Sequence, residues 1–251
     1  MQQVNRTTLG QGRGFNLYGR SDRRANSRHA TSRNKRYKGD TRSQKNQYHS
    51  NNRQSLPDNR QIINQYLQSS KTKDDVLRVT VNNIKKSIIQ NNPNHALILL
   101  NNVKNAEITP NTISYNATIS ACEKAGGTDG MTNALTLLQE MKNSGISPDS
   151  ITYNAAISAC EKAGGTDGMT NALQLLQEMK NAGITPNTIT YSATISACEK
   201  AGGTDGMSHA RSLLQEMRTK GITPDTITYS AAISACEKAG GTNGMTNALT
   251  L

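Results

Sequence analysis

Residues 112–251 carry a pattern of apolar positions that is typical of paired amphipathic helices. In a first stretch, about Thr112 to Ala125, the apolar residues are spaced i, i+4 and i+7 and share one helix face, at Tyr115, Ile119 and Cys122. In a second stretch, about Met131 to Ser144, they form a wider face, at Met131, Ala134, Leu135, Leu138 and Met141. The pattern therefore predicts two helices joined by a short connection.

The residues that flank these stretches are of the kinds that begin and end helices. A capping side chain precedes the first helix, glycines separate the two helices, and a glycine and a proline follow the second, at Asn111 or Thr112, Gly126, Gly127, Gly130, Gly145 and Pro148. We expect Gly126 and Gly127 to end the first helix and Gly130 to keep the connection loose. We expect Gly145 to take the left-handed conformation that often follows a helix.

This helical pair recurs every 38 residues. The period is plain at the cysteines, prolines and tyrosines, which are Cys122, Cys160, Cys198 and Cys236, Pro110, Pro148, Pro186 and Pro224, and Tyr115, Tyr153, Tyr191 and Tyr229. The units are 112–149, 150–187, 188–225 and a partial copy at 226–251, and the first two are identical at 31 of 38 positions. One helical hairpin cannot bury both of its apolar faces, whereas stacked copies can. The sequence therefore predicts an all-α fold, an α-solenoid of helix-turn-helix repeats.

The solenoid is expected to extend beyond the clear repeats. Residues 61–111 are expected to hold a capping helix and a degenerate repeat at 77–111, because Ile84 and Ile88 supply the stripe of a first helix. At the other end, Leu251 falls within the second helix of its unit. We expect further repeats of a longer array, or a protein partner, to cover the apolar face there.

Charge separates a tail from the repeats. Residues 1–60 hold 14 Lys and Arg against 3 Asp and Glu, whereas residues 61–251 hold 15 of each. The first stretch has no hydrophobic periodicity, so we expect a disordered basic N-terminal tail. Three interpretations stay open: an RNA-contacting arm with interleaved aromatics, a cleavable organelle transit peptide, or a solubilising tail.

Other classes of chemistry find little support in the sequence. No run of eighteen apolar residues occurs, so no membrane association is expected. The cysteines fit neither a disulfide scaffold nor a zinc site and are expected to pack in the core. Of four histidines, none belongs to a His, Glu and Cys constellation. We therefore expect no enzyme activity, no metal and no cofactor.

The unit closely resembles the pentatricopeptide repeat. The residues that carry this resemblance run ITYNAAISACEKAG from Ile151 to Gly164 and continue with Ala172-Leu173, Leu176, Glu178-Met179-Lys180 and Gly183-Ile184-Thr185-Pro186-Asn187. The resemblance is strong over 112–251 and weak over 77–111. The units here are about three residues longer than is usual for the family, and we expect the extra residues to lie in the turn between the paired helices.

The resemblance implies binding of single-stranded RNA, with one base read by each unit. By this resemblance, the first reader of a unit is the residue directly after its Tyr, and the second reader is the residue directly after its Pro. The pairs are Asn116 with Asp149, Asn154 with Asn187, and Ser192 with Asp225, and Ser230 is a first reader without a second reader. The resemblance further implies uracil for the Asn/Asp pair, cytosine for the Asn/Asn pair, and a purine, guanine above all, for the Ser/Asp pair. Apolar contact with the bases is assigned to Ile113, Ile151, Ile189 and Ile227.

Two alternatives remain beside RNA reading. The reader residues are also of the types that cap helices, so they could serve as caps alone. A helical-repeat array can equally be a scaffold that binds a peptide or a partner protein. If the chain binds RNA, a role in RNA processing, stability or translation is expected, in mitochondria or alternatively in the cytoplasm.

Overall fold

The computed structural model describes residues 61, 64, 68–69, 72–90 and 92–250 of the chain. The chain divides into two units, Met1–Gln54 and Ser55–Leu251, and all described residues belong to the second. The expected basic tail and most of the expected capping helix lie outside the described residues.

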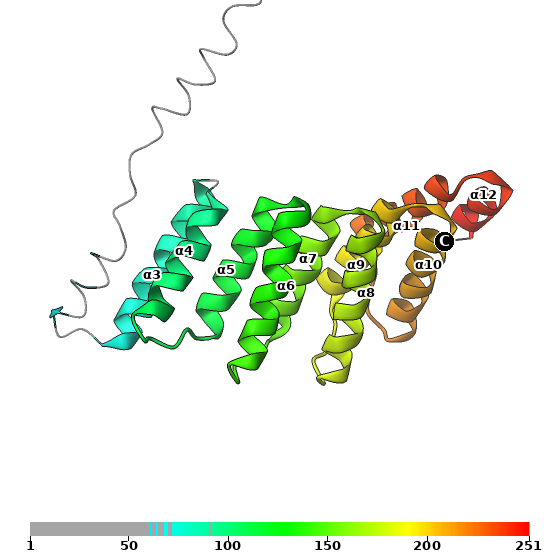
Figure 1. Cartoon of the computed structure of the whole chain (residues 1–251). Coiled ribbons are helices and arrows are strands. Elements are labelled where there is room, and N and C mark those ends of the chain that lie inside the picture. The colour runs from blue at the N-terminus through cyan, green and yellow to red at the C-terminus, as the bar shows by residue number, and fades with distance from the viewer. Residues whose placement is uncertain (1–60, 62–63, 65–67, 70–71, 91, 251) are drawn as a thin grey trace, which may run out of the picture. The chain divides into compact units, whose positions relative to one another are not determined.

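Over 72–90 and 92–250 the chain forms helices and no strand, which confirms the predicted all-α solenoid. The helices stand in one row as successive pairs (Figure 1). They are α3 Lys73–Ile89, α4 Pro93–Asn105, α5 Thr112–Ala125, α6 Gly127–Asn143, α7 Ser150–Ala163, α8 Gly165–Asn181, α9 Thr188–Ala201, α10 Gly203–Thr219, α11 Thr226–Ala239 and α12 Gly241–Leu249.

The first helix of each clear unit begins at a capping box. In α5 the Asn111 side chain accepts a hydrogen bond from the Ser114 backbone N–H, and the Ser114 hydroxyl accepts one from the Asn111 N–H. Asn111, rather than Thr112, is thus the cap. The same arrangement starts the later first helices, with caps at Asp149, Asn187 and Asp225.

The second helices begin about one turn earlier than the sequence pattern predicts. α6 starts at Gly127, because Gly126 in the left-handed region (φ 67°) both ends α5 and directly precedes α6. The expectation that the extra residues of the unit lie in the turn is therefore wrong. They form the first turn of the second helix, where the charge of Asp129 suits the positive end of the helix dipole.

Gly130 lies inside α6, so the prediction that it keeps the connection loose is also wrong. A Cβ at this position would lie 2.5 Å from the carbonyl oxygen of Cys122 in α5. The equivalent Gly168 has the same relation to Cys160. Glycine is needed here because the backbones of the two paired helices meet without an intervening side chain.

The core is an apolar layer between the first and second helices. The predicted Tyr, Ile and Cys stripe is buried in the complete units, with Tyr115, Ile119 and Cys122 at most 2% exposed. Side chains of the second helices, such as Leu138 and Met141, belong to the same cluster. All four cysteines are free and buried, and burial raises the pKa of Cys160 to about 12. Their predicted place in the core is confirmed.

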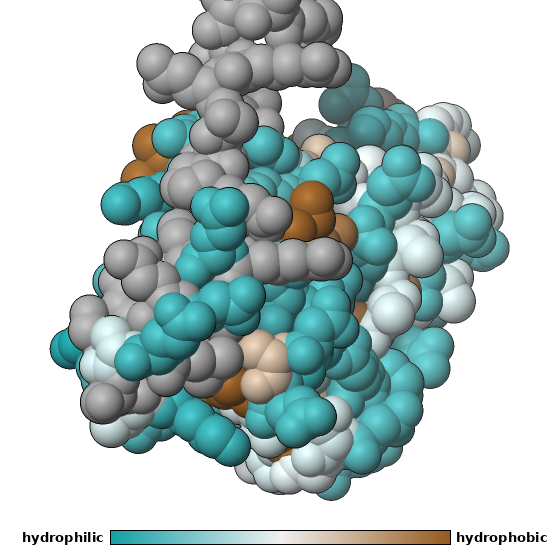
Figure 2. Space-filling view, turned by 60° about the vertical axis from the view of Figure 1, so that its left-hand side comes forward, coloured by the Kyte–Doolittle hydropathy of each residue, from teal (hydrophilic) through white to brown (hydrophobic). Residues whose placement is uncertain are grey.

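The first helices form one continuous layer. Each packs against the next first helix, α3 on α5, α5 on α7, α7 on α9 and α9 on α11, as well as against the second helices beside it. Equivalent residues of successive units are therefore neighbours along this layer. The end of the array that carries α3 is largely hydrophilic, with isolated hydrophobic patches (Figure 2).

The degenerate repeat uses α3 and α4. Ile84 is buried and Ile88 is half-buried, as their first-helix stripe predicts. After α4, Glu107 takes a left-handed conformation with φ 56°. The clear units place a glycine at the equivalent position, as at Gly145 with φ 72°, which confirms the expectation for that residue.

Candidate nucleic-acid interface

A row of isoleucines stands exposed along the layer of first helices. Each is the second residue of its helix, and their side chains are 60–65% exposed, at Ile113, Ile151, Ile189 and Ile227. Large apolar side chains are normally buried, and here the exposure is nearly equal at every step of the array. The row therefore offers one apolar contact for a planar group in each unit.

In the first clear unit, the two candidate readers lie in direct contact. The Asn116 amide nitrogen donates to both carboxylate oxygens of Asp149, at 3.0 and 3.2 Å. Asn116 is only 8% exposed. Burial alone would raise the pKa of Asp149, but hydrogen bonds from Thr152 and Asn116 outweigh it and lower that pKa. The carboxyl group is thus held in its ionised, accepting form.

The next two units vary this arrangement. In the second, the Asn154 amide oxygen accepts a hydrogen bond from the Thr190 hydroxyl at 2.6 Å, and the Asn187 oxygen lies 3.0 Å from the same hydroxyl. In the third, Ser192 is 3.4 Å from a carboxylate oxygen of Asp225. Each predicted reader pair is therefore brought together, although its members lie 33 residues apart in the sequence.

The second reader of each pair is also the cap of the following first helix. Asp149, Asn187 and Asp225 accept hydrogen bonds from the backbone N–H of Thr152, Thr190 and Thr228, at 2.8–3.1 Å. Capping and base reading are thus compatible, because a capping side chain stays half-buried or exposed at the surface of the layer.

A shallow groove runs between α9 and α11 at the last of these sites. It contains Ile227 and the exposed Ser230, the reader without a second partner residue. Apart from that isoleucine its lining is made of hydroxyl residues, one alanine and one glutamate, at Ser196, Thr226, Ser230, Ser234, Ala231 and Glu199. These two candidate residues therefore share a hollow on the surface of the first-helix layer.

Sequence reasoning missed the threonines that link the units. Thr152, Thr190 and Thr228 are fully buried, and their hydroxyls lie 2.5–2.6 Å from the first reader of the preceding unit. The signal was present as a hydroxyl residue 36 positions after each reader. Its meaning depends on the stacking of units, which the sequence pattern of one unit does not contain.

Ion pairs between units were missed as well. Along the first helices, Lys162, Lys200 and Lys238 pair with Glu123, Glu161 and Glu199 at 2.5–2.7 Å. These pairs balance the charge of the layer. Within the described residues, no group of His, Cys, Asp and Glu side chains suits a metal ion, and no described helix has the length and apolar character to cross a membrane.

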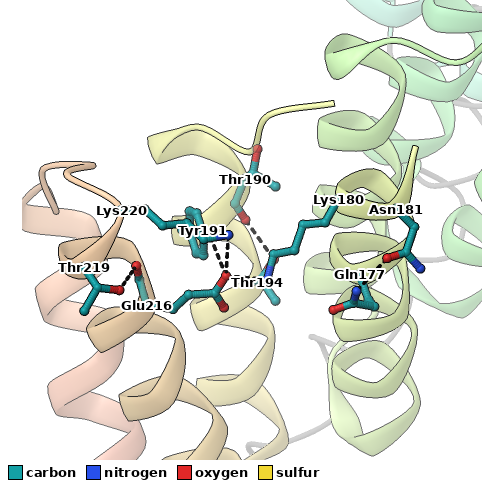
Figure 3. A network of polar contacts seen from close by, with 9 residues as sticks. All are labelled: Gln177, Lys180, Asn181, Thr190, Tyr191, Thr194, Glu216, Thr219 and Lys220. Atoms are coloured by element: carbon teal, nitrogen blue, oxygen red, sulfur yellow. Dashed lines mark hydrogen bonds and ion pairs between the residues drawn. The ribbon is translucent and has the colours of Figure 1, made fainter. Parts of the chain in front are cut away.

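A second set of ion pairs joins successive second helices, and its glutamates also accept hydrogen bonds from the buried tyrosines. Glu216 accepts from the Tyr191 hydroxyl at 2.9 Å and pairs with Lys180 of the preceding unit at 2.6 Å and with Lys220 at 2.9 Å (Figure 3). Burial alone would raise the pKa of Glu216, but these hydrogen bonds lower it to about 2. The same contacts recur at Tyr115 with Glu140 and at Tyr153 with Glu178.

These features define a helical-repeat solenoid with polar pairs and exposed isoleucines at a regular step. The family model described as the pentacotripeptide-repeat region of PRORP matches residues 101–248, which is more than half of the chain. The chain belongs to the pentatricopeptide repeat family. None of the curated proteins compared with the chain matches it.

Solved structures share the fold. The PPR domain of Arabidopsis thaliana protein-only RNase P 1, solved in complex with tRNA, is 15% identical with a TM-score of 0.58, over 71% of this chain and 88% of that one. The pentatricopeptide repeat protein PPR10, solved with an 18-nt psaJ RNA element, is 22% identical with a TM-score of 0.54, over 69% of this chain and 25% of that one.

Proposed function

We propose that the chain binds single-stranded RNA along its first-helix layer, with one base at each unit. The observation that carries this proposal is that a polar reader pair and an exposed isoleucine recur in each of three successive units. Stacking of closely similar units places these groups at an even step, as reading of successive bases requires. The two RNA complexes of solved family members support it.

The polar atoms of each pair suggest its base. In the first unit, Asp149 offers only acceptors and suits the N3–H donor of uracil. In the second, Asn187 takes the place of the carboxylate, so the amide nitrogens of the pair can donate to the N3 acceptor of cytosine. In the third, the small Ser192 beside Asp225 leaves room for a purine, and we assign guanine.

The repeats alone give modest affinity. Base stacking contributes about 1–3 kcal/mol per base, so three complete units supply affinity in the micromolar range at best. Three lysines of the first-helix layer, Lys162, Lys200 and Lys238, are already paired with glutamates. The excess positive charge lies in residues 1–60, and we propose that this tail contacts phosphates. The role we propose is non-catalytic, in RNA processing, stability or translation.

The test is selection from a random RNA pool by the full chain, followed by binding at several salt concentrations. We expect enrichment of adjacent uracil, cytosine and purine, and log affinity that falls linearly with log salt. Ile151→Ser should lower the affinity for the selected RNA about tenfold, as loss of one stacking contact implies. Ile98→Ser is the matched control, because Ile98 is an exposed isoleucine of α4 outside the row.

The outcomes separate the alternatives. Tight, strongly salt-dependent binding without base enrichment would assign RNA affinity to the tail and contradict base reading. Absence of RNA binding would contradict the whole proposal and favour a scaffold for a peptide or partner protein.

The compartment we propose is the mitochondrial matrix, with the cytoplasm as the alternative. The tail is rich in Arg and Ser and poor in acidic residues, as transit peptides are. Mass spectrometry of the mature N-terminus tests this. A shortened N-terminus would indicate a removed transit peptide and would contradict the proposed contact of the tail with phosphates. An intact Met1 would contradict removal of a transit peptide and would favour a retained RNA-contacting arm.

A further inference from the structure

We propose that a buried threonine at the third position of a first helix orients the first reader of the preceding unit, and that at Thr190 this orientation sets the base preference of the unit 150–187. This inference rests on the proposed base reading. The residues are Thr152, Thr190 and Thr228, each assigned to one unit but bonded through its side chain to the reader of the unit before it. They are positioning residues, because they are fully buried and act through the reader.

The hydrogen bonds of Thr190 show how it orients Asn154. Its hydroxyl oxygen accepts the Asn187 backbone N–H at 3.1 Å. The one hydroxyl proton is left for an acceptor, and the shortest distance is to the Asn154 amide oxygen, at 2.6 Å. The Asn154 oxygen is thereby turned inward and its NH₂ group outward. Among the described residues that nitrogen has no hydrogen-bond partner, so it is available to a base.

An amide without such an anchor could rotate by half a turn. It would then present an acceptor where it had presented a donor, and the two pyrimidines differ in just this respect at N3. The Asn187 amide is held separately, because its oxygen accepts the Thr190 backbone N–H at 3.1 Å. The Thr190 hydroxyl also lies 3.0 Å from the Asn187 oxygen, but that oxygen keeps its backbone hydrogen bond when the hydroxyl is removed. Loss of the hydroxyl therefore releases mainly the first reader, Asn154.

The first clear unit is built with a second anchor. The Thr152 hydroxyl lies 2.5 Å from the Asn116 amide oxygen, and the Asn116 nitrogen donates to Asp149. Both ends of that amide are held. Loss of the hydroxyl should leave Asn116 oriented by Asp149 alone, whereas Asn154 has no equivalent support. The two threonines have the same burial and the same capping bonds, so they form a matched pair.

The experiment compares Thr190→Val with Thr152→Val in the full chain. Binding is measured to RNA oligomers that differ only by cytosine or uracil at the nucleotide of one unit. Thr190→Val should reduce discrimination at the unit 150–187 about fivefold, the effect of one hydrogen bond. Discrimination at the unit 188–225, to which Thr190 itself belongs, should not change. Thr152→Val should reduce discrimination at the unit 112–149 less than twofold.

Conservative variants separate orientation from folding. Thr190→Ser keeps the hydroxyl and should restore discrimination, as the chain itself uses Ser114 at the equivalent position. Thr194→Ala removes a buried hydroxyl of the same helix that bonds only the Thr190 carbonyl, and Ala156 and Ala232 occupy this place in other units. It should leave discrimination unchanged. If Thr190→Val lowers the helical circular dichroism, Thr190→Cys takes its place.

The inference would be overturned if the wild type clearly preferred one base and Thr190→Val showed the same preference, of the same size. Equal losses in Thr190→Val and Thr152→Val would assign the threonines to capping only and would also overturn it. Absence of base preference in the wild type would instead contradict the proposed base reading itself.

Discussion

The close contact between paired helices makes Gly168→Ala an informative change. At an open helical position, replacement of Gly by Ala stabilises a protein by about 1 kcal/mol through helix propensity. Here the new Cβ would lie 2.5 Å from the Cys160 carbonyl oxygen, which itself accepts the Gly164 N–H at the end of α7. Neither backbone segment can move aside without loss of that bond. Overpacking of this kind costs about 1–3 kcal/mol, so after the gain from propensity we expect a net loss of up to about 2 kcal/mol.

The assay is urea denaturation followed by circular dichroism, with Thr166→Ala as control. Thr166 is exposed in the first turn of the same helix, where the change alters propensity without new contacts. We expect the control to change the free energy of unfolding by less than about 0.5 kcal/mol. Helix propensity would raise the free energy of unfolding, whereas overlap with the Cys160 carbonyl oxygen would lower it. The sign of the measured change therefore shows which effect is larger. If Gly168→Ala raised the stability by about 1 kcal/mol, the direct backbone contact between α7 and α8 would be refuted.

Two further changes test other parts of the structure. Glu107→Gly should raise the free energy of unfolding by about 0.5–1 kcal/mol, because Glu107 has φ 56° where other units use glycine. Urea denaturation measures this change, and a loss of stability would contradict backbone strain at Glu107. The pKa of Glu216 falls from 4.5 to about 2 on folding. The contribution of ionised Glu216 to the free energy of unfolding is therefore fully present above pH about 4.5 and is lost as the pH falls through about 2. Glu216→Gln should therefore flatten the fall in stability between these pH values, and denaturation curves of unchanged pH dependence would argue against the network around Tyr191.

Local signals predicted the first helices well. The cap at Asn111, the stripe of Tyr115, Ile119 and Cys122 and the ending at Gly126 all lie within one helix, so the sequence of a single unit contains them. The start of the second helix was not predictable in this way. A run such as Gly126-Gly127 indicates a turn by composition, and the need for Gly130 arises only from its contact with the Cys122 carbonyl oxygen in the neighbouring helix.

The candidate site likewise has features that the sequence predicts and features that depend on contacts between units. The exposed isoleucines and the reader positions follow from the resemblance and from the repeat period. The contact between Asn116 and Asp149 joins residues 33 positions apart, and it forms because the end of one unit meets the start of the next. The role of Thr152 depends on that meeting. Interactions between units could therefore be identified only from the structure, whereas those within a helix could be predicted from the sequence.

The most direct test of base reading is the replacement Asn187→Asp. The first unit already carries Asp149 at this position beside the same kind of first reader, Asn116. The replacement removes a donor and leaves only acceptors, so the unit 150–187 should change its preference from cytosine to uracil. Stability should barely change, because Asp and Asn are nearly equal as helix caps.

The measurement is binding of wild type and Asn187→Asp to paired RNA oligomers that differ only at the nucleotide of this unit, at fixed salt. The account predicts that the wild type prefers cytosine and the variant prefers uracil. If both proteins bind tightly but rank the two oligomers identically, base reading by Asn154 and Asn187 is contradicted. The polar pairs would then be helix caps alone.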